Sequence, residues 1–271
     1  MTTAQKIIKY FAIALAAVII VSIASGIYFG GAAIIGIFDG EDGSIGEMKE
    51  LSLDGSARPS LLDVEIAASS MTVKTGDTLR VETNNSGISC SIHRDTLKIT
   101  EKRSGAFNKG SVDSVLIITL PRDLVFNSAD IETGAGKIVI ESLSAHEFSL
   151  ELGAGETVIN SLNVSGDAEV SGGAGRLEIK NAEIGHLDVD HGVGELCVRA
   201  RIKNGGEFDC GVGRVELILS GSREDYTVKA HKGLGDIKVD GISANDGQTV
   251  GGGSSRIDIN GGIGAVEVSF E

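Results

Sequence analysis

Apolar and polar residues alternate along the C-terminal half of the chain in a pattern that returns every 19 to 22 residues. Each copy contains a short glycine turn, and an apolar residue usually stands two and four positions after the last glycine. A fixed period of this length indicates one structural unit that is copied and stacked. The seven turns are Gly134-Ala135-Gly136, Gly153-Ala154-Gly155, Gly173-Ala174-Gly175, Gly192-Val193-Gly194, Gly211-Val212-Gly213, Gly233-Leu234-Gly235 and the degenerate Gly253-Ser254-Ser255.

The alternation on both sides of each turn predicts two strands per unit, each with one buried face. After the turns, the predicted inward residues begin with Ile138, Thr157, Leu177, Leu196, Val215, Ile237 and Ile257, and continue with Ile140, Ile159, Ile179, Val198, Leu217, Val239 and Ile259. Three positions before the turns stand Ile131, Leu150, Val170, Val189, Phe208, Ala230 and Val250.

A strand–turn–strand unit cannot enclose a core alone, so neighbouring units must stack. We therefore predict an all-β fold, a parallel β-solenoid with about 19–22 residues per coil and a rise of about 4.8 Å per coil. The glycines would supply positive φ or close chain approach at a tight corner, and the residue between them is predicted to fill the corner of the core. A meander of antiparallel hairpins folded into a sandwich is the alternative, because strand–GxG–strand also fits a hairpin.

The first 38 residues differ in composition from the rest. Lys6 and Lys9 precede an uncharged apolar run, residues 10–38, which is long enough to span a bilayer. The lysines predict a cytoplasmic N-terminus and an extracytoplasmic C-terminal domain, a single-pass signal-anchor in the cell membrane. A cleaved signal peptide, with Ser22-Ile23-Ala24 as the cleavage region, is the alternative.

The rest of the chain divides into three predicted parts. Residues 39–60 form a linker rich in glycine and acidic residues. Residues 61–126 form an irregular β region that caps or begins the stack, and residues 127–271 form the glycine-turn solenoid, closed by residues 261–271.

Charge narrows the range of partners. All 38 acidic residues and 22 of the 24 basic residues follow residue 38, so the net charge of that part is 22 − 38 = −16. Such a surface repels nucleic acid, and we expect no nucleic-acid partner. The three cysteines cannot all pair internally. A bond between Cys197 and Cys210 is conceivable, but free thiols are expected.

The order of motifs resembles a known family. Leu97-Lys98-Ile99, then Ile117-Ile118-Thr119-Leu120-Pro121, then Ile131-Glu132-Thr133-Gly134-Ala135-Gly136-Lys137-Ile138 and its copies are similar to the DUF4097 family of bacterial β-strand-repeat proteins, which carries an adhesin label. The resemblance covers residues 61–271. It transfers no catalytic or binding residues, and some relatives adjoin envelope-stress regulators.

The sequence predicts no catalytic, cofactor-binding or metal site. The glycines recur in every unit and precede strands, unlike the single glycine loop and helix of a nucleotide site. A calcium β-roll needs Asp where Leu177 stands. No metal-binding spacing links the five histidines, His93, His146, His186, His191 and His231. A polysaccharide-cleaving β-helix enzyme would need long loop insertions and aromatic platforms, and Tyr226 is the only tyrosine after residue 38.

We therefore expect a membrane-anchored, non-catalytic surface scaffold or adhesin-like interaction module with no cofactor. The alternative is an accessory regulator of envelope-stress sensing that acts through a membrane partner. A surface or membrane protein is the expected partner, and the chain is expected to be a monomer or small oligomer. The column Lys137, Glu156, Arg176, Glu195, Arg214, Asp236 and Arg256 is predicted to stabilise the stack as a charge ladder.

Overall fold

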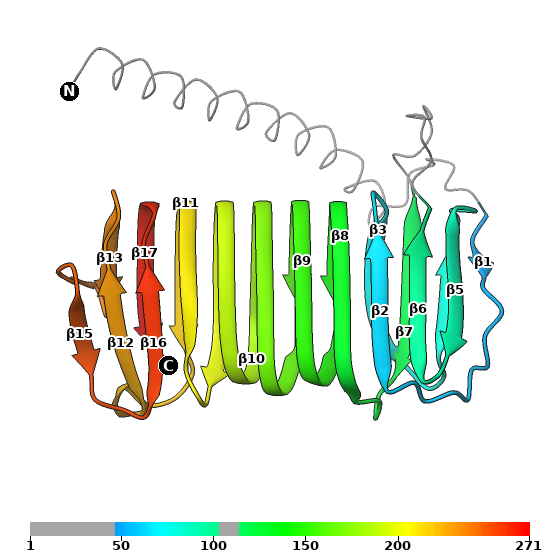
Figure 1. The fold of residues 1–271 in the computed structure, drawn as a ribbon, viewed down its shortest axis with the longest axis horizontal. Coiled ribbons are helices and arrows are strands. Elements are labelled where there is room, and N and C mark those ends of the chain that lie inside the picture. The colour runs from blue at the N-terminus through cyan, green and yellow to red at the C-terminus, as the bar shows by residue number, and fades with distance from the viewer. Residues whose placement is uncertain (1–46, 103–113) are drawn as a thin grey trace, which may run out of the picture. The chain divides into compact units, whose positions relative to one another are not determined.

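The computed structural model describes residues 47–102 and 114–271, which belong to one compact, all-β unit (Figure 1). The single helical element in these ranges is the 3₁₀ turn η2 (Arg223–Asp225). The strands are β1 (Lys49–Glu50), β2 (Leu61–Ile66), β3 (Ser70–Gly76), β4 (Arg80–Thr83), β5 (Ile88–His93), β6 (Thr96–Glu101), β7 (Val115–Pro121), β8 (Phe126–Ile140), β9 (Leu143–Ile159), β10 (Leu162–Ile202), β11 (Gly206–Leu219), β12 (Tyr226–His231), β13 (Asp236–Val239), β14 (Ile242–Ser243), β15 (Gln248–Gly251), β16 (Ser255–Asn260) and β17 (Ile263–Phe270).

The central coils stack in parallel, one above the next. β8 pairs with β9, β9 with β10, and the second part of β10 with β11, all in parallel register. Ile131 lies opposite Leu150, and Ile138 opposite Thr157, so the sequence period becomes the stacking register. The solenoid prediction is confirmed, and the sandwich of antiparallel hairpins is excluded for these coils.

The glycine turns are sharp bends inside otherwise continuous strands. The second glycine of most turns has a positive φ, for example +141° at Gly155. The first glycine lies against the backbone of the neighbouring coil: a Cβ at Gly153 would stand 1.9 Å from the carbonyl oxygen of Gly134. Both predicted reasons for glycine, the left-handed backbone and the close chain approach, therefore apply.

The residue between the two glycines does not fill the core corner, and that prediction is wrong. Ala135 and Ala154 are exposed, while Thr133 and Ile138 on either side of the first bend are buried. The flanking inward side chains already occupy the corner, so the middle Cβ points toward solvent.

At the N-terminal end, the stacking order departs from the chain order. β2 pairs in parallel with both β6 and β8, and β3 with both β7 and β8. Residues 61–76 thus form a coil between the coil of residues 96–121 and the coil of residues 126–140. The region that looked irregular contributes two coils without a GxG turn. β4 and β5 lie antiparallel against β7 and β6, and β1 against β4, which covers this end.

The C-terminal end has a similar exchange of order. β16 and β17 pair in parallel with β11 on one side and with β12 and β13 on the other. The last coil of the chain is therefore inserted before the last coil of the stack. Residues 261–271 therefore do not close the end of the stack, as the sequence suggested, because β17 lies between β11 and β13. That end is covered by β14 and β15, which run antiparallel to β13 and β12.

Because of this exchange, the predicted position of the seventh glycine turn is wrong. Gly262-Ile263-Gly264 lies in register with Gly211-Val212-Gly213 and forms the bend of the last coil. Gly253-Ser254-Ser255 instead leads into β16, whose first residue, the buried Ser255, donates a hydrogen bond of 2.8 Å from its hydroxyl to the Ile202 carbonyl. The 20-residue period misassigned this turn because a cap of two strands interrupts the repeat.

The core is a continuous aliphatic column with few aromatic rings. Ile131, Leu150, Val170, Val189 and Phe208 are at most 4% exposed, which confirms the inward column before the turns for these coils. Ile259 takes the next position in that column opposite Phe208, where Val250 does not lie.

No helix in the described part of the chain combines the length and the apolar character that a membrane span requires. The apolar run of residues 10–38 lies outside the described residues.

Candidate functional site

Each central coil presents two broad faces, one from the strand before the glycine bend and one from the strand after it. We call the outward side of the strands before the bend the acidic face. Carboxylates occupy it across five consecutive coils: Asp130, Glu132, Glu151, Glu169, Asp188, Asp190, Glu207 and Asp209, all exposed.

Several carboxylates of the acidic face lie directly opposite one another in adjacent strands. Glu132 is in register with Glu151, Asp188 with Glu207, and Asp190 with Asp209. Like charges in register destabilise a sheet, by up to roughly 1 kcal/mol a pair in water. The acidic face therefore opposes the stacking of the coils on which it is built.

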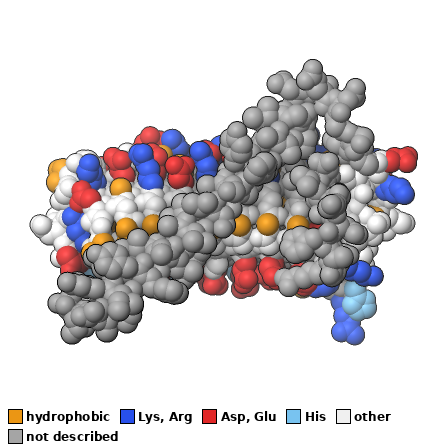
Figure 2. Space-filling view, turned by 90° about the horizontal axis from the view of Figure 1, so that it is seen from above, with side chains coloured by type: hydrophobic (Ala, Val, Ile, Leu, Met, Phe, Trp, Pro, Cys, Tyr) orange, Lys and Arg blue, Asp and Glu red, His pale blue; other side chains and the backbone are white. Residues whose placement is uncertain are grey.

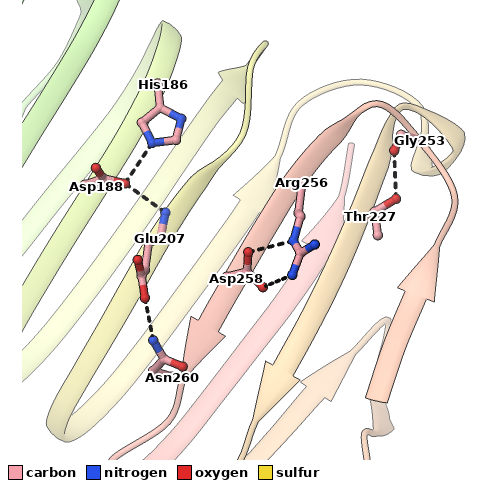
Figure 3. Close-up of polar contacts among 8 residues, drawn as sticks. All are labelled: His186, Asp188, Glu207, Thr227, Gly253, Arg256, Asp258 and Asn260. Atoms are coloured by element: carbon pink, nitrogen blue, oxygen red, sulfur yellow. Dashed lines mark hydrogen bonds and ion pairs between the residues drawn. The ribbon is translucent and has the colours of Figure 1, made fainter. Parts of the chain in front are cut away.

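Basic side chains do not neutralise these eight carboxylates. Among the described residues, none of them forms an ion pair with Lys or Arg. Polar contacts are made instead: His186 Nε2 lies 3.0 Å from Asp188, and the Asn260 amide donates to Glu207 at 2.8 Å (Figure 3). The same Asn260 amide also donates to Asp209 at 2.7 Å. The backbone N–H of Glu207 also donates to Asp188 (Figure 3). The negative charge of this face is left uncompensated.

The strands after the bend carry a different pattern, the predicted charge ladder. Lys137 lies opposite Glu156 with 3.4 Å between charged groups, and Arg176 reaches Glu195 at 3.8 Å. The ladder holds as far as Arg214, which lies opposite Glu195 in the coil before it and opposite Ala265 in the coil after it. Its predicted final members leave the alternating pattern. Asp236 also lies opposite Ala265, and Arg256 belongs to β16, where it binds Asp258 (Figure 3).

Between the two faces runs the narrow edge made by the glycine bends. We call this edge, with the side-chain rows beside it, the bend trough. Figure 2 shows a line of hydrophobic side chains along it, between a mostly acidic row and a row of mixed charge. A shallow groove of about 480 Å³ lies along its acidic side, over four coils. The groove is lined by Glu132, Thr133, Gly134, Glu151, Leu152, Gly153, Ser171, Gly172, Gly173, Asp190 and Gly192.

His191 lies beneath this edge and is only 3% exposed. Neither ring nitrogen has a hydrogen-bond partner of normal geometry. Burial lowers the pKa of His191, and the Gly194 backbone and Asp190 oppose that shift more weakly. Cys210 lies in register with His191, and burial raises the pKa of its thiol to about 12. This pair is therefore neutral at physiological pH.

The other histidines and cysteines do not converge on a common centre. His146 Nδ1 contacts the Ser165 hydroxyl at 2.9 Å, and His231 lies in register with Asn260. No group of three or more metal-binding side chains occurs in residues 47–102 and 114–271. All three cysteines are free thiols.

Sequence reasoning recognised the strong negative charge but treated it as a general property of the surface. The parallel register was needed to collect the carboxylates on one face. The trough was missed because the residue between the glycines was predicted to point inward. In most copies an acidic residue stands two positions before the first glycine of the turn. This constant spacing could have indicated both the acidic face and the bend trough.

The repeating coils and bends belong to a segment of the chain that matches a protein-family model. Residues 62–268 match the model of the Toastrack family, DUF4097. The chain is a Toastrack protein. The resemblance predicted from the motifs is therefore confirmed.

Solved structures that match this Toastrack chain share little sequence with it. A "putative adhesin" from Bacteroides fragilis is 15% identical, with a TM-score of 0.53, and the match covers 82% of this chain and 96% of that one. A "putative lipid binding protein" from Parabacteroides distasonis is 14% identical, with a TM-score of 0.34 and coverage of 84% and 98%. The first likeness supports the fold alone. No curated protein matches the chain.

Proposed function

We propose that this Toastrack protein is a non-catalytic interaction module that presents its solenoid on the outer side of a cell membrane. The observation that carries the proposal is the contrast between the two faces. One face stabilises itself with alternating charges, and the other keeps like charges in register without cationic partners. A surface that opposes its own folding is explained by a partner that neutralises it.

Several features support this class of function over catalysis. The groove on the trough is shallow and lined mainly by glycine and carboxylates, whereas an enzyme site is usually a deep, largely apolar pocket. Two cavities near the bends of the described coils hold only about 20 and 10 Å³, enough for about one water molecule each. The similar structure from Bacteroides fragilis is described as a putative adhesin, which is consistent with this proposal.

The proposed placement rests on the sequence. The lysines before residues 10–38 favour a cytoplasmic N-terminus, with the solenoid outside. Protease added to intact cells should then remove the C-terminal domain. Complete protection, in cells whose lysis is controlled, would contradict this placement.

Photo-crosslinking in cells tests the interaction itself. A crosslinking residue at Ser171 on the acidic face should yield a defined protein adduct, while one at Cys197 on the opposite face should not. Both positions lie in β10 and point away from the core. The same adducts from both positions, or none from either, would contradict a partner on the acidic face. A partner embedded in the same membrane would favour the regulatory alternative, and one on another surface would favour adhesion.

A further inference from the structure

The bend trough has a small, smooth floor between two rows of longer side chains. Over four coils the floor consists of glycines with Ala135, Ala154, Ala174 and Val193 between them. On one side stand Glu132, Glu151, Ser171 and Asp190, and on the other the ladder of Lys137, Glu156, Arg176 and Glu195. Nothing larger than alanine rises from the floor of the first three coils, so a partner can approach the backbone closely.

Farther along the stack the floor becomes strongly apolar. Val212, Ile263 and Leu234 occupy the same middle position in the next three coils. They are 39%, 52% and 84% exposed, respectively. Contiguous exposed aliphatic side chains of this kind mark an interaction surface. The line of hydrophobic side chains in Figure 2 follows this edge.

The spacing of the coils suits a helix laid along the trough. Neighbouring parallel strands lie about 4.8 Å apart, so the same position recurs at that distance from coil to coil. An α-helix advances about 5.4 Å per turn, and its side chains at i, i+4 and i+7 recur on one face at nearly this distance. An extended strand repeats the same side only every 6.4–6.8 Å or so and falls out of step sooner.

The acidic side chains beside the floor indicate which type of helix would fit the trough. Glu132, Glu151 and Asp190 border the groove, and no Lys or Arg among the described residues pairs with them. The opposite wall alternates in sign and contributes little net field. A helix with aliphatic residues on one face and Lys or Arg along one flank would satisfy both the floor and the acidic row.

We propose that the bend trough binds an amphipathic, basic α-helix from another polypeptide. This inference rests on the proposed interaction function and specifies its partner. The aliphatic face of the helix lies on the middle residues of the bends, and its basic flank faces Glu132, Glu151 and Asp190. A helix of about 12 residues, roughly 18 Å long, covers the four coils from Ala135 to Val193, and one of about 20 residues also reaches Val212, Ile263 and Leu234.

Synthetic peptides test this proposal on the full-length protein in neutral detergent. The probe is a 15-residue helical peptide with Leu at i, i+4, i+7 and i+11 and Lys along one flank. One control peptide scrambles the same composition, and a second replaces Lys by Glu. We expect binding of the first peptide, at least tenfold weaker binding of the scrambled one and none of the acidic one, measured by fluorescence anisotropy.

Three protein variants locate the site. Ala154→Phe fills the trough from an exposed position and should abolish binding without lowering Tm. Glu132→Gln with Glu151→Gln should weaken binding about five- to tenfold. Glu169→Gln with Glu207→Gln removes the same charge from the same face, away from the trough, and should change binding less than twofold.

Each remaining result counts against the proposal. Equal binding of the scrambled peptide, or equal loss in both double variants, would show sequence-independent attraction to the acidic face. Absence of peptide binding would contradict the proposal that the trough binds a helix. Binding of neutral phosphatidylcholine vesicles, or of a second copy of the chain, in place of the peptide would also contradict it. If crosslinking from Ser171 still yields a protein adduct, the interaction function survives the loss of this inference. If crosslinking also fails, both fall.

Discussion

At the scale of the residue, His191 is a buried side chain whose charge state affects stability. It stands in the corner column that Thr133, Leu152 and Gly172 occupy in the preceding coils. Its pKa is lowered by burial, so the folded protein disfavours the proton that the unfolded chain accepts near pH 6.5. The neutral Cys210 thiol beside it supplies no compensating charge, and the protonated form is favoured only by the Gly194 backbone and, more weakly, by Asp190.

The stability of the solenoid should therefore fall as the pH drops below about 6.5, by at most about 1.4 kcal/mol per pH unit from this group. The loss ends once the pH is below the folded-state pKa of His191. His191→Leu should abolish this part of the pH dependence, measured as Tm between pH 7.5 and 5. His146→Leu, at an exposed histidine, is the control and should leave the slope unchanged. An unaltered slope in His191→Leu would assign the effect to other groups.

At the scale of the element, the C-terminal end of the stack depends on β16 and β17 to stay folded. These strands separate β11 from β12 and β13, although they come last in the chain. A stack in chain order would lose only its terminal coil on truncation. The observed order makes the preceding coil depend on the last one.

We therefore expect truncation after Ser254 to expose residues 226–251 to protease. That segment then keeps no parallel stacking partner, and a lone pair of short antiparallel strands is only marginally stable in water. Limited proteolysis with mass spectrometry measures the effect, and residues 126–219 serve as the internal control that stays protected. Cleavage confined to residues 212–219, with 226–251 still resistant, would contradict the observed order.

At the scale of the whole molecule, both ends of the stack are closed by short antiparallel strands. β1 covers β4 at one end, helped by a 2.8 Å bond from the Leu51 N–H to the Val81 carbonyl, and β14 and β15 cover the other. Short, partly covered edges resist the strand pairing that builds filaments. The expected state remains a monomer or small oligomer.

A fragment of residues 45–271 should show no filaments by light scattering at pH 7 and physiological salt. A fragment that begins at Leu61 lacks β1 and exposes β4, so it should associate more readily at equal concentration. Both should aggregate near their isoelectric points, where charge repulsion vanishes; that of the whole chain is about 4.8. Filaments of the longer fragment at pH 7 would contradict closure of the ends and would instead indicate a polymerising scaffold.

Much of the fold could be predicted from particular residues. The alternation around Ile131 and Ile138 specified which side chains enter the core, because a strand turns successive residues to opposite faces. The glycine pairs specified the bends, because a Cβ at Gly153 would meet the neighbouring backbone. The ladder from Lys137 to Arg214 followed from the same period, since a parallel stack places equivalent residues side by side. All of this information is local and repeats from coil to coil.

The sequence alone therefore determined the repeating coil, its inward and outward residues and the family. Only the tertiary structure decided the order of the coils at the two ends, because several parallel pairings satisfy the same alternation and long-range contacts choose among them. It also decided that the middle residue of each bend points outward, since the space inside the corner is already filled by its neighbours. The acidic face and the bend trough arise from these choices. Each carboxylate is visible in the sequence, but only stacking in register brings them together on one surface.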